Sequence, residues 1–109
     1  MGESPFRFMR SMLMFDLPVE TAAERRSYAR FVKFLKKQGF IMFQKSIYCK
    51  LSINESSVKL LEKTIKNNLP KKGMVSILTL TENQFNSIEF LLGEFETDVL
   101  NTNERIVEL

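Results

Sequence analysis

The chain has 109 residues, of which 44% are hydrophobic, and this size suits one domain with one core. It has no histidine and one cysteine, which excludes Ser-His and Cys-His nucleophile pairs, zinc sites built on His or Cys, and internal disulfides. The net charge of +3 divides into +9 over residues 1–81 and −6 over residues 82–109, so the body of the chain is suited to a polyanionic partner.

The cysteine content and the apolar runs indicate a cytoplasmic protein. Cys49 has no cysteine to pair with, which fits a reducing compartment. The apolar runs fall far short of the ~20 residues that a spanning helix needs, so we expect no membrane contact. Composition predicts three parts: a disordered lead-in over residues 1–7, a folded domain over residues 8–92, and an acidic tail with a terminal strand over residues 93–109.

The first predicted element is a strand over Phe8–Leu17. Its centre, residues 12–15, is apolar at every position, which predicts a central strand buried on both faces. Asp16 follows at the carboxyl end of this strand, where folds commonly place their chemistry, and Pro18 ends the strand. Two interpretations of Asp16 stay open: a carboxylate that binds metal, or a residue that only shapes the turn.

A helix is predicted from Thr21 to about Gln38, with Gly39 as its stop. Thr21 and Glu24 form a capping-box pattern. One stripe of the helix is apolar and would face the sheet: Tyr28, Phe31, Val32 and Leu35. A second stripe is basic, ~16 Å long, and is either a solvated helix face or a phosphate-binding surface. With its neighbour Arg25, it supplies the candidate nucleic-acid-binding residues Arg25, Arg26, Arg30, Lys33 and Lys37.

The middle of the chain predicts further strands and a second helix. Phe40–Leu51 is rich in strand-forming residues, and it forms either one long bent strand or two strands joined near Lys45. A helix follows over Glu55–Asn68, with Asn54 or Ser52 as its cap. Residues 74–80 predict a second apolar strand beside the first.

The end of the domain predicts a capped turn at Thr81, then a short helix and a strand over residues 85–92. A terminal strand over Arg105–Leu109 is suited to add to the sheet edge of another chain. The order of elements predicts an α+β fold: a ferredoxin-like βαββαβ sandwich with two helices on one face and a C-terminal extension. The bare face of that sheet would need cover, which predicts a homodimer.

Six segments together resemble a known family, although each segment alone is weak evidence for it. They are residues 12–18 (Met-Leu-Met-Phe-Asp-Leu-Pro), 24–31, 39–40, 44–48 (Gln-Lys-Ser-Ile-Tyr), 70–73 (Pro-Lys-Lys-Gly) and 80–85. In order and spacing they resemble CRISPR-associated protein 2, the small adaptation protein, in the form found in type II bacterial systems. The resemblance covers about residues 8–109.

The resemblance implies a homodimer that bridges two integrase dimers and binds the duplex protospacer during spacer acquisition. It also implies contact with the other type II adaptation proteins and the effector nuclease. Members of the family are described as Mg²⁺-dependent endonucleases on RNA or double-stranded DNA. The catalytic, metal-binding aspartate of the family maps onto Asp16, paired with the same residue of the second subunit, with Mg²⁺ or Mn²⁺ as the ion. The terminal strand is the predicted partner contact, through Arg105, Ile106, Val107 and Leu109.

Two alternatives stay open beside the adaptation role. One is a stand-alone, metal-dependent endoribonuclease or DNase of toxin-like type, which would use the same aspartate. The other is a general RNA-binding module of similar topology. Such modules expose aromatic residues on the sheet within a recognisable motif, and no such pattern is clear in this sequence, so this alternative ranks last.

Overall fold

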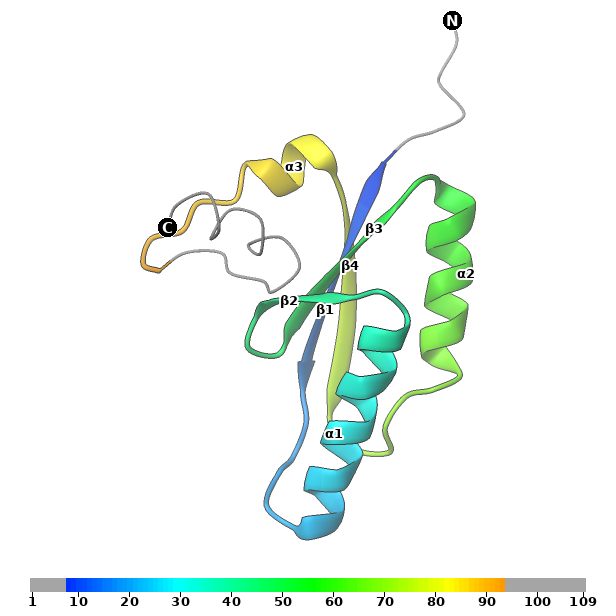
Figure 1. The fold of residues 1–109 in the computed structure, drawn as a ribbon, viewed down its shortest axis with the longest axis vertical. Coiled ribbons are helices and arrows are strands. Elements are labelled where there is room, and N and C mark those ends of the chain that lie inside the picture. The colour runs from blue at the N-terminus through cyan, green and yellow to red at the C-terminus, as the bar shows by residue number, and fades with distance from the viewer. Residues whose placement is uncertain (1–7, 94–109) are drawn as a thin grey trace, which may run out of the picture.

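The computed structural model describes residues 8–93 and shows a single sheet with helices packed on it (Figure 1). The elements, in chain order, are β1 (Met9–Asp16), α1 (Ala22–Lys37), β2 (Ile41–Gln44), β3 (Ile47–Ser52), α2 (Glu55–Lys66), β4 (Met74–Thr81) and α3 (Glu82–Asn86). Within the described residues the strands pair antiparallel in the order β2-β3-β1-β4. This is the predicted ferredoxin-like α+β fold. The lead-in and the predicted terminal strand lie outside the described residues.

Strand β1 is central, as its uniformly apolar middle predicts. It pairs with β3 and β4 along its length, so that Met12 lies between Cys49 and Leu78. Met12, Leu13 and Phe15 are buried, because neighbouring side chains cover both faces of the strand. Successive side chains point to opposite faces, so this one strand supplies both cores.

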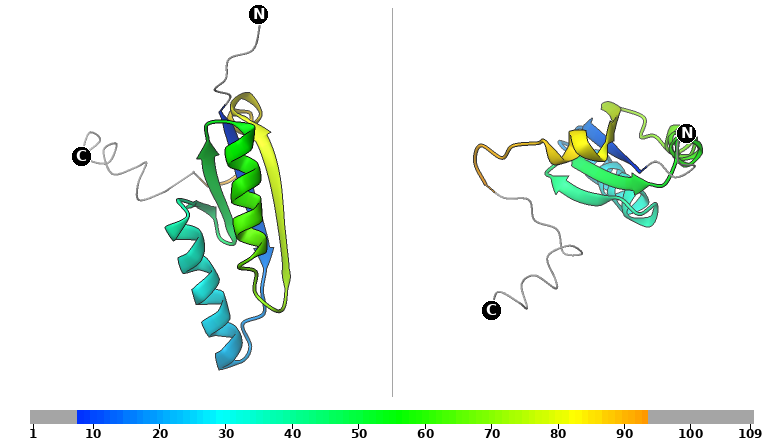
Figure 2. Two further views of the ribbon diagram at one scale, coloured as in Figure 1. Left: turned by 90° about the vertical axis from the view of Figure 1, so that its right-hand side faces the viewer. Right: turned by 90° about the horizontal axis from the view of Figure 1, so that it is seen from above.

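Helices α1 and α2 lie on one face of the sheet (Figure 2). Leu13 and Phe15 from β1 pack there among buried side chains of the two helices, namely Phe31, Leu35, Leu61 and Ile65. The Phe15 ring lies 5.6 Å from the Phe31 ring and 5.7 Å from the Tyr28 ring, both in edge-on geometry. This apolar, aromatic-rich layer confirms the predicted apolar stripe of α1.

The opposite face is only partly covered. Phe85 of α3 packs on Met12, Phe43 and Cys49 in a second, smaller core. Arg10 holds α3 in place: its Nε donates to Glu82 Oε2 at 2.7 Å, and its guanidinium carbon lies 4.6 Å from the centre of the Phe85 ring. Beyond α3 this face stays open: Met74 is 71% exposed and Leu78 is 48% exposed. The homodimer that would cover it remains a prediction.

The structure decides two local questions that the sequence left open. Residues 41–52 form two strands, and Ser46 in the tight connection has a φ of +67°. Asn54, and not Ser52, caps α2 by accepting a hydrogen bond from the Ser57 N–H at 2.8 Å.

The strand expected after the short helix is wrong. Residues 87–93 contain no strand, because the segment leaves the sheet after α3 instead of pairing with it. Leu91 and Leu92 are accordingly 93% and 95% exposed. No helix within residues 8–93 is both long and apolar enough to cross a bilayer.

Candidate nucleic-acid interface

The basic side chains of α1 project away from the sheet. The capping box starts the helix at a defined residue: Thr21 Oγ1 accepts from the Glu24 N–H, and Glu24 Oε1 accepts from the Thr21 N–H, both at 3.0 Å. Burial of Phe31 and Leu35 then fixes the rotation of the helix. All five predicted contact residues are exposed as a result: Arg25, Arg26, Arg30, Lys33 and Lys37.

Arg25 differs from the other four cations. Its guanidinium donates to the carbonyl oxygens of Val19 and Glu20 at 3.0 and 2.9 Å, so it closes the connection between β1 and α1. The other four, which we call the α1 basic row, make no hydrogen bond or ion pair with any residue of the range 8–93: Arg26, Arg30, Lys33 and Lys37. Their charges are therefore available to a partner.

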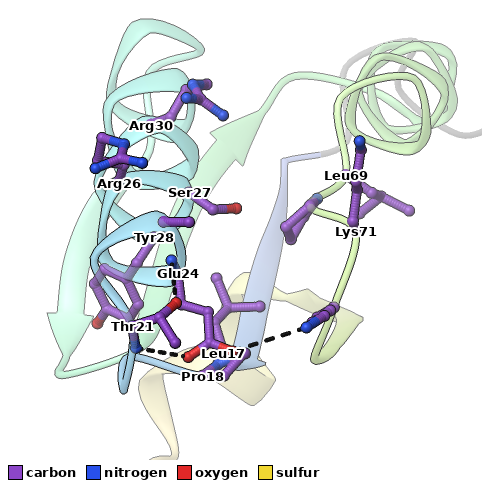
Figure 3. A pocket seen from close by; sticks show the side chains of 13 residues that line it. Leu17, Pro18, Thr21, Glu24, Arg26, Ser27, Tyr28, Arg30, Leu69 and Lys71 are labelled. Atoms are coloured by element: carbon purple, nitrogen blue, oxygen red, sulfur yellow. Dashed lines mark hydrogen bonds and ion pairs between the residues drawn. The ribbon is translucent and has the colours of Figure 1, made fainter.

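A cleft of about 450 Å³ lies between the first half of α1 and the turn that leads from α2 into β4 (Figure 3). Arg26 and Arg30 stand on the helix side, and Lys71 and Lys72 stand on the turn side. Leu17 and Pro18, directly after β1, line its base. Lys71 and Lys72 are not among the binding residues predicted from the sequence, although they form part of a segment that carries the family resemblance.

One carboxylate shares this cleft with the four cations. Glu24 Oε2 lies 4.0 Å from Lys72 Nζ across the cleft. The hydrogen bond from the Thr21 backbone lowers the pKa of Glu24 below its ordinary value; desolvation opposes this, and the Glu20 N–H and the Lys72 charge add to the lowering. Glu24 therefore stays charged at neutral pH, and the cleft carries a net positive charge.

Asp16 lies at the same end of the sheet but on the other face. It pairs with Met74 of β4 and shares the face of Met12 and Met14, because side chains alternate along β1. Its side chain is exposed and makes no hydrogen bond or ion pair with residues 8–93. No hydrogen bond of the Asp16 side chain to these residues therefore supports the interpretation that Asp16 only shapes the turn. The fold also separates Asp16 from the α1 basic row, because α1 covers the opposite face of the sheet.

The glycine of the Pro-Lys-Lys-Gly segment packs against the backbone of Asp16. Gly73 has a φ of +105°, and a Cβ at this position would lie 2.7 Å from the Asp16 carbonyl oxygen and 2.7 Å from Leu17 Cδ2. Only glycine fits this contact without a shift of the backbone. The turn is therefore held tightly against the end of β1.

The structure also bears on the predicted metal site at Asp16 and on the environment of Cys49. Within residues 8–93 no group of three or more His, Cys, Asp or Glu side chains could hold a metal ion. Burial raises the pKa of the Cys49 thiol to about 11, and the thiol packs in the second core with Met12, Phe43 and Phe85. The four predicted partner contacts lie outside the described residues: Arg105, Ile106, Val107 and Leu109.

Comparison with known proteins supports the resemblance seen in the sequence. The family model described as CRISPR associated protein Cas2 matches residues 9–88. A protein from Ligilactobacillus salivarius is 48% identical over 101 residues, which cover 93% of this chain and all of the relative. Proteins from Streptococcus mutans serotype c and Treponema denticola are each 46% identical over 101 residues, covering 93% of this chain and 93% and 100% of the relatives. All three relatives are named CRISPR-associated endoribonuclease Cas2.

Proposed function

This chain belongs to the CRISPR associated protein Cas2 family, and we propose that it acts in CRISPR adaptation as a homodimer that bridges integrase dimers and binds the duplex protospacer. The observation that carries the proposal is the α1 basic row, whose four charges are exposed and unpaired within residues 8–93. The other type II adaptation proteins and the effector nuclease are proposed as further partners.

The geometry of the row suits a phosphate backbone. The four cations span ~16 Å along one side of a rigid helix, at ~1.5 Å of rise per residue. Phosphates on one DNA strand are separated by ~3.4 Å of helical rise, so the row can meet several of them without reading base sequence. A protein that receives duplexes of many sequences needs this kind of contact.

The test neutralises part of the row in the full chain. The R26Q/R30Q/K33Q variant should bind a duplex more weakly and lower the slope of log affinity against log salt by up to ~2.7, because each lost phosphate contact removes ~0.9 from the slope. The matched control is K59Q/K63Q/K66Q, which removes three exposed charges from α2. Equal slopes in the two variants would show that the row binds no phosphates and that only net charge matters.

The assembly is tested separately from DNA binding. Leu78→Glu places a charge on the open face of the sheet, and we expect it to convert a dimer into a monomer in light scattering. Deletion of residues 105–109 should weaken association with the integrase. An unchanged mass for Leu78→Glu would exclude the open face as the dimer contact, and an intact complex after the deletion would exclude the terminal segment.

We propose, as a second function, Mg²⁺- or Mn²⁺-dependent endonuclease activity at Asp16, and two observations favour it. Asp16 is exposed on the open face and has no hydrogen bond or ion pair with residues 8–93, and the relatives carry the name endoribonuclease. Its carboxylate is the kind of oxygen ligand that Mg²⁺ prefers, and Asp16 from each of two subunits, with water molecules, would hold the ion. When bound, such an ion polarises a phosphate and activates water. A stand-alone nuclease of toxin-like type, acting on RNA or DNA, would use the same site.

Asp16→Asn tests this activity, since the amide keeps the size of the side chain and removes its charge. We expect loss of cleavage and of Mn²⁺ binding, whereas Glu20→Gln, a nearby exposed carboxylate, should keep both. If purified Asp16→Asn cleaves as fast as the parent, the activity does not belong to this site. If cleavage stops while spacer acquisition continues, the nuclease activity is not what adaptation uses.

A further inference from the structure

The helix-covered face of the sheet is apolar at one end and polar at the other. Towards the carboxyl end of β1 it carries Leu13 and Phe15, which pack in the larger core. Towards the amino end, Ser11 takes the place of an apolar residue, and Ser52 of β3 lies on the same face. Ser11 is 0% exposed and Ser52 is 4% exposed. Two buried hydroxyl groups therefore lie where apolar side chains usually pack.

Neither of these hydroxyl groups has a hydrogen-bond partner among residues 8–93. The backbone of the strands around them is engaged in the pairing of β1 with β3 and β4. Most buried polar groups in folded proteins are hydrogen-bonded to protein or to ordered water, because a buried hydroxyl without a partner is costly. The two serines therefore call for a small ligand that both donates and accepts hydrogen bonds.

The strand register places the two serines within reach of one such ligand. Ser52 pairs with Met9 and Ser11 pairs with Lys50, so the serines are diagonal neighbours on adjacent strands. Diagonal neighbours on one face have backbones roughly 7–8 Å apart and Cβ atoms somewhat closer. A water molecule that bonds each hydroxyl at ~2.8 Å bridges oxygen atoms up to ~5.6 Å apart, whereas a direct bond requires half that separation.

Helix α2 covers this end of the face, and its first half contributes one buried side chain, Val58 (Figure 2). Val58 belongs to neither apolar cluster, whereas Leu61 and Ile65 further along the helix pack in the larger core. Lys50, directly opposite Ser11, donates from its Nζ to the Gln38 carbonyl oxygen at 2.6 Å and so caps the end of α1. Small side chains beneath a single buried valine favour room for one water molecule.

We propose that Ser11 and Ser52 bind one internal water molecule, which bridges β1 and β3 beneath the first half of α2. Internal water molecules make about three hydrogen bonds and occur about once per 27 residues, so a domain of this size should hold a few. Thr79, half-buried opposite Ser11 on the same face of β4, is placed to supply the third bond. Helix α2 then packs partly on a hydrated surface, whereas α1 packs on an apolar one.

Serine-to-alanine variants of the full chain test the bridge by urea denaturation. S11A and S52A each leave the water and the other hydroxyl short of a partner, so each should raise the equilibrium constant for unfolding about fivefold. S11A/S52A should raise it by clearly less than the product of about 25-fold, because the second change removes no further bridge. The matched control S76A changes an exposed serine of β4 and should have little effect.

A crystal structure of the parent protein gives the direct test. We expect a water molecule within ~3 Å of both hydroxyl oxygens. The proposal is overturned if no water lies there, or if S11A or S52A is as stable as the parent or more stable, since removal of a hydroxyl without a partner relieves a desolvation cost. Single effects that multiply fully in the double variant would also overturn it, because the two hydroxyls would then act separately.

Discussion

The two faces of the sheet differ in how completely they are covered. On one face α1 and α2 bury Leu13 and Phe15 so well that they are 0% and 7% exposed. On the other, α3 covers one end, and Met74 and Leu78 remain exposed. Strand β1 contributes side chains to both faces, so the difference in coverage comes from the elements that pack on the strand and not from the strand itself.

This difference separates the larger buried core from the face that carries Asp16 and the proposed dimer contact. The helix-covered face has the larger apolar cluster, where burial stabilises the fold. The open face carries the exposed Asp16 and the uncovered apolar side chains, which are the features a partner or substrate would use. Four predictions test this division, from the largest expected effect to the smallest.

The largest effect is expected from Leu13→Ala on the helix-covered face. It removes a fully buried side chain and should lower the free energy of unfolding by about 2–5 kcal/mol, measured by urea denaturation with an unchanged m-value. Met12→Ala changes the next residue, on the opposite face, and should cost less because its surroundings can collapse around the cavity. Equal losses would show that the two faces are equally close-packed.

Gly73→Ala tests the junction between the end of β1 and the lysine turn. The added methyl group would clash with the Asp16 carbonyl oxygen and require an unfavourable φ of +105°, so we expect a loss of roughly 1–3 kcal/mol. Gly93→Ala is the matched control, because Gly93 also has a positive φ, +86°, but a Cβ there meets no atom within 4 Å. If both variants lose the same stability, the contact with Asp16 contributes nothing.

A smaller effect is expected from Arg10→Gln, which removes the ion pair to Glu82 and the contact with the Phe85 ring. Both partners are partly exposed, so the loss should be about 1 kcal/mol. It should appear as faster hydrogen exchange of the α3 amides, with the β1 amides unchanged. Uniform acceleration throughout the sheet would show that α3 does not open by itself.

The smallest effect concerns the reactivity of Cys49. Burial raises the pKa of its thiol to about 11, so the native protein should resist thiol labelling at pH 8 and react once urea unfolds it. The thiol loses its proton more readily in the unfolded chain, so its contribution to stability is present below pH 9 and is lost as the pH rises through about 11. Rapid labelling of the native parent protein would show that the Cys49 thiol is accessible to the reagent and that α3 does not cover it.

Most of the fold could be predicted because the signals for it are local. The capping box of Thr21 and Glu24 and the apolar spacing of α1 each depend on residues within a few positions of one another. The hairpin was harder to predict, since one bent strand and two strands have the same composition. The antiparallel pairing of β2 with β3 and the positive φ of Ser46 distinguish the two cases. The strand expected after the short helix is absent because a strand needs a neighbour to pair with, and apolar composition does not supply one.

The candidate site likewise has features that follow from local sequence and features that depend on tertiary packing. The residue pattern alone predicts that Asp16 ends a buried strand and that the α1 basic row lies along one stripe of a helix, because both follow from the period of a single element. Packing places Asp16 and the row on opposite sides of the sheet, and it brings Lys71 and Lys72 to a cleft with Arg26 and Arg30. Those relations depend on how β1, α1 and the turn before β4 pack together, and residues so far apart in the chain carry no periodic signal of their contact.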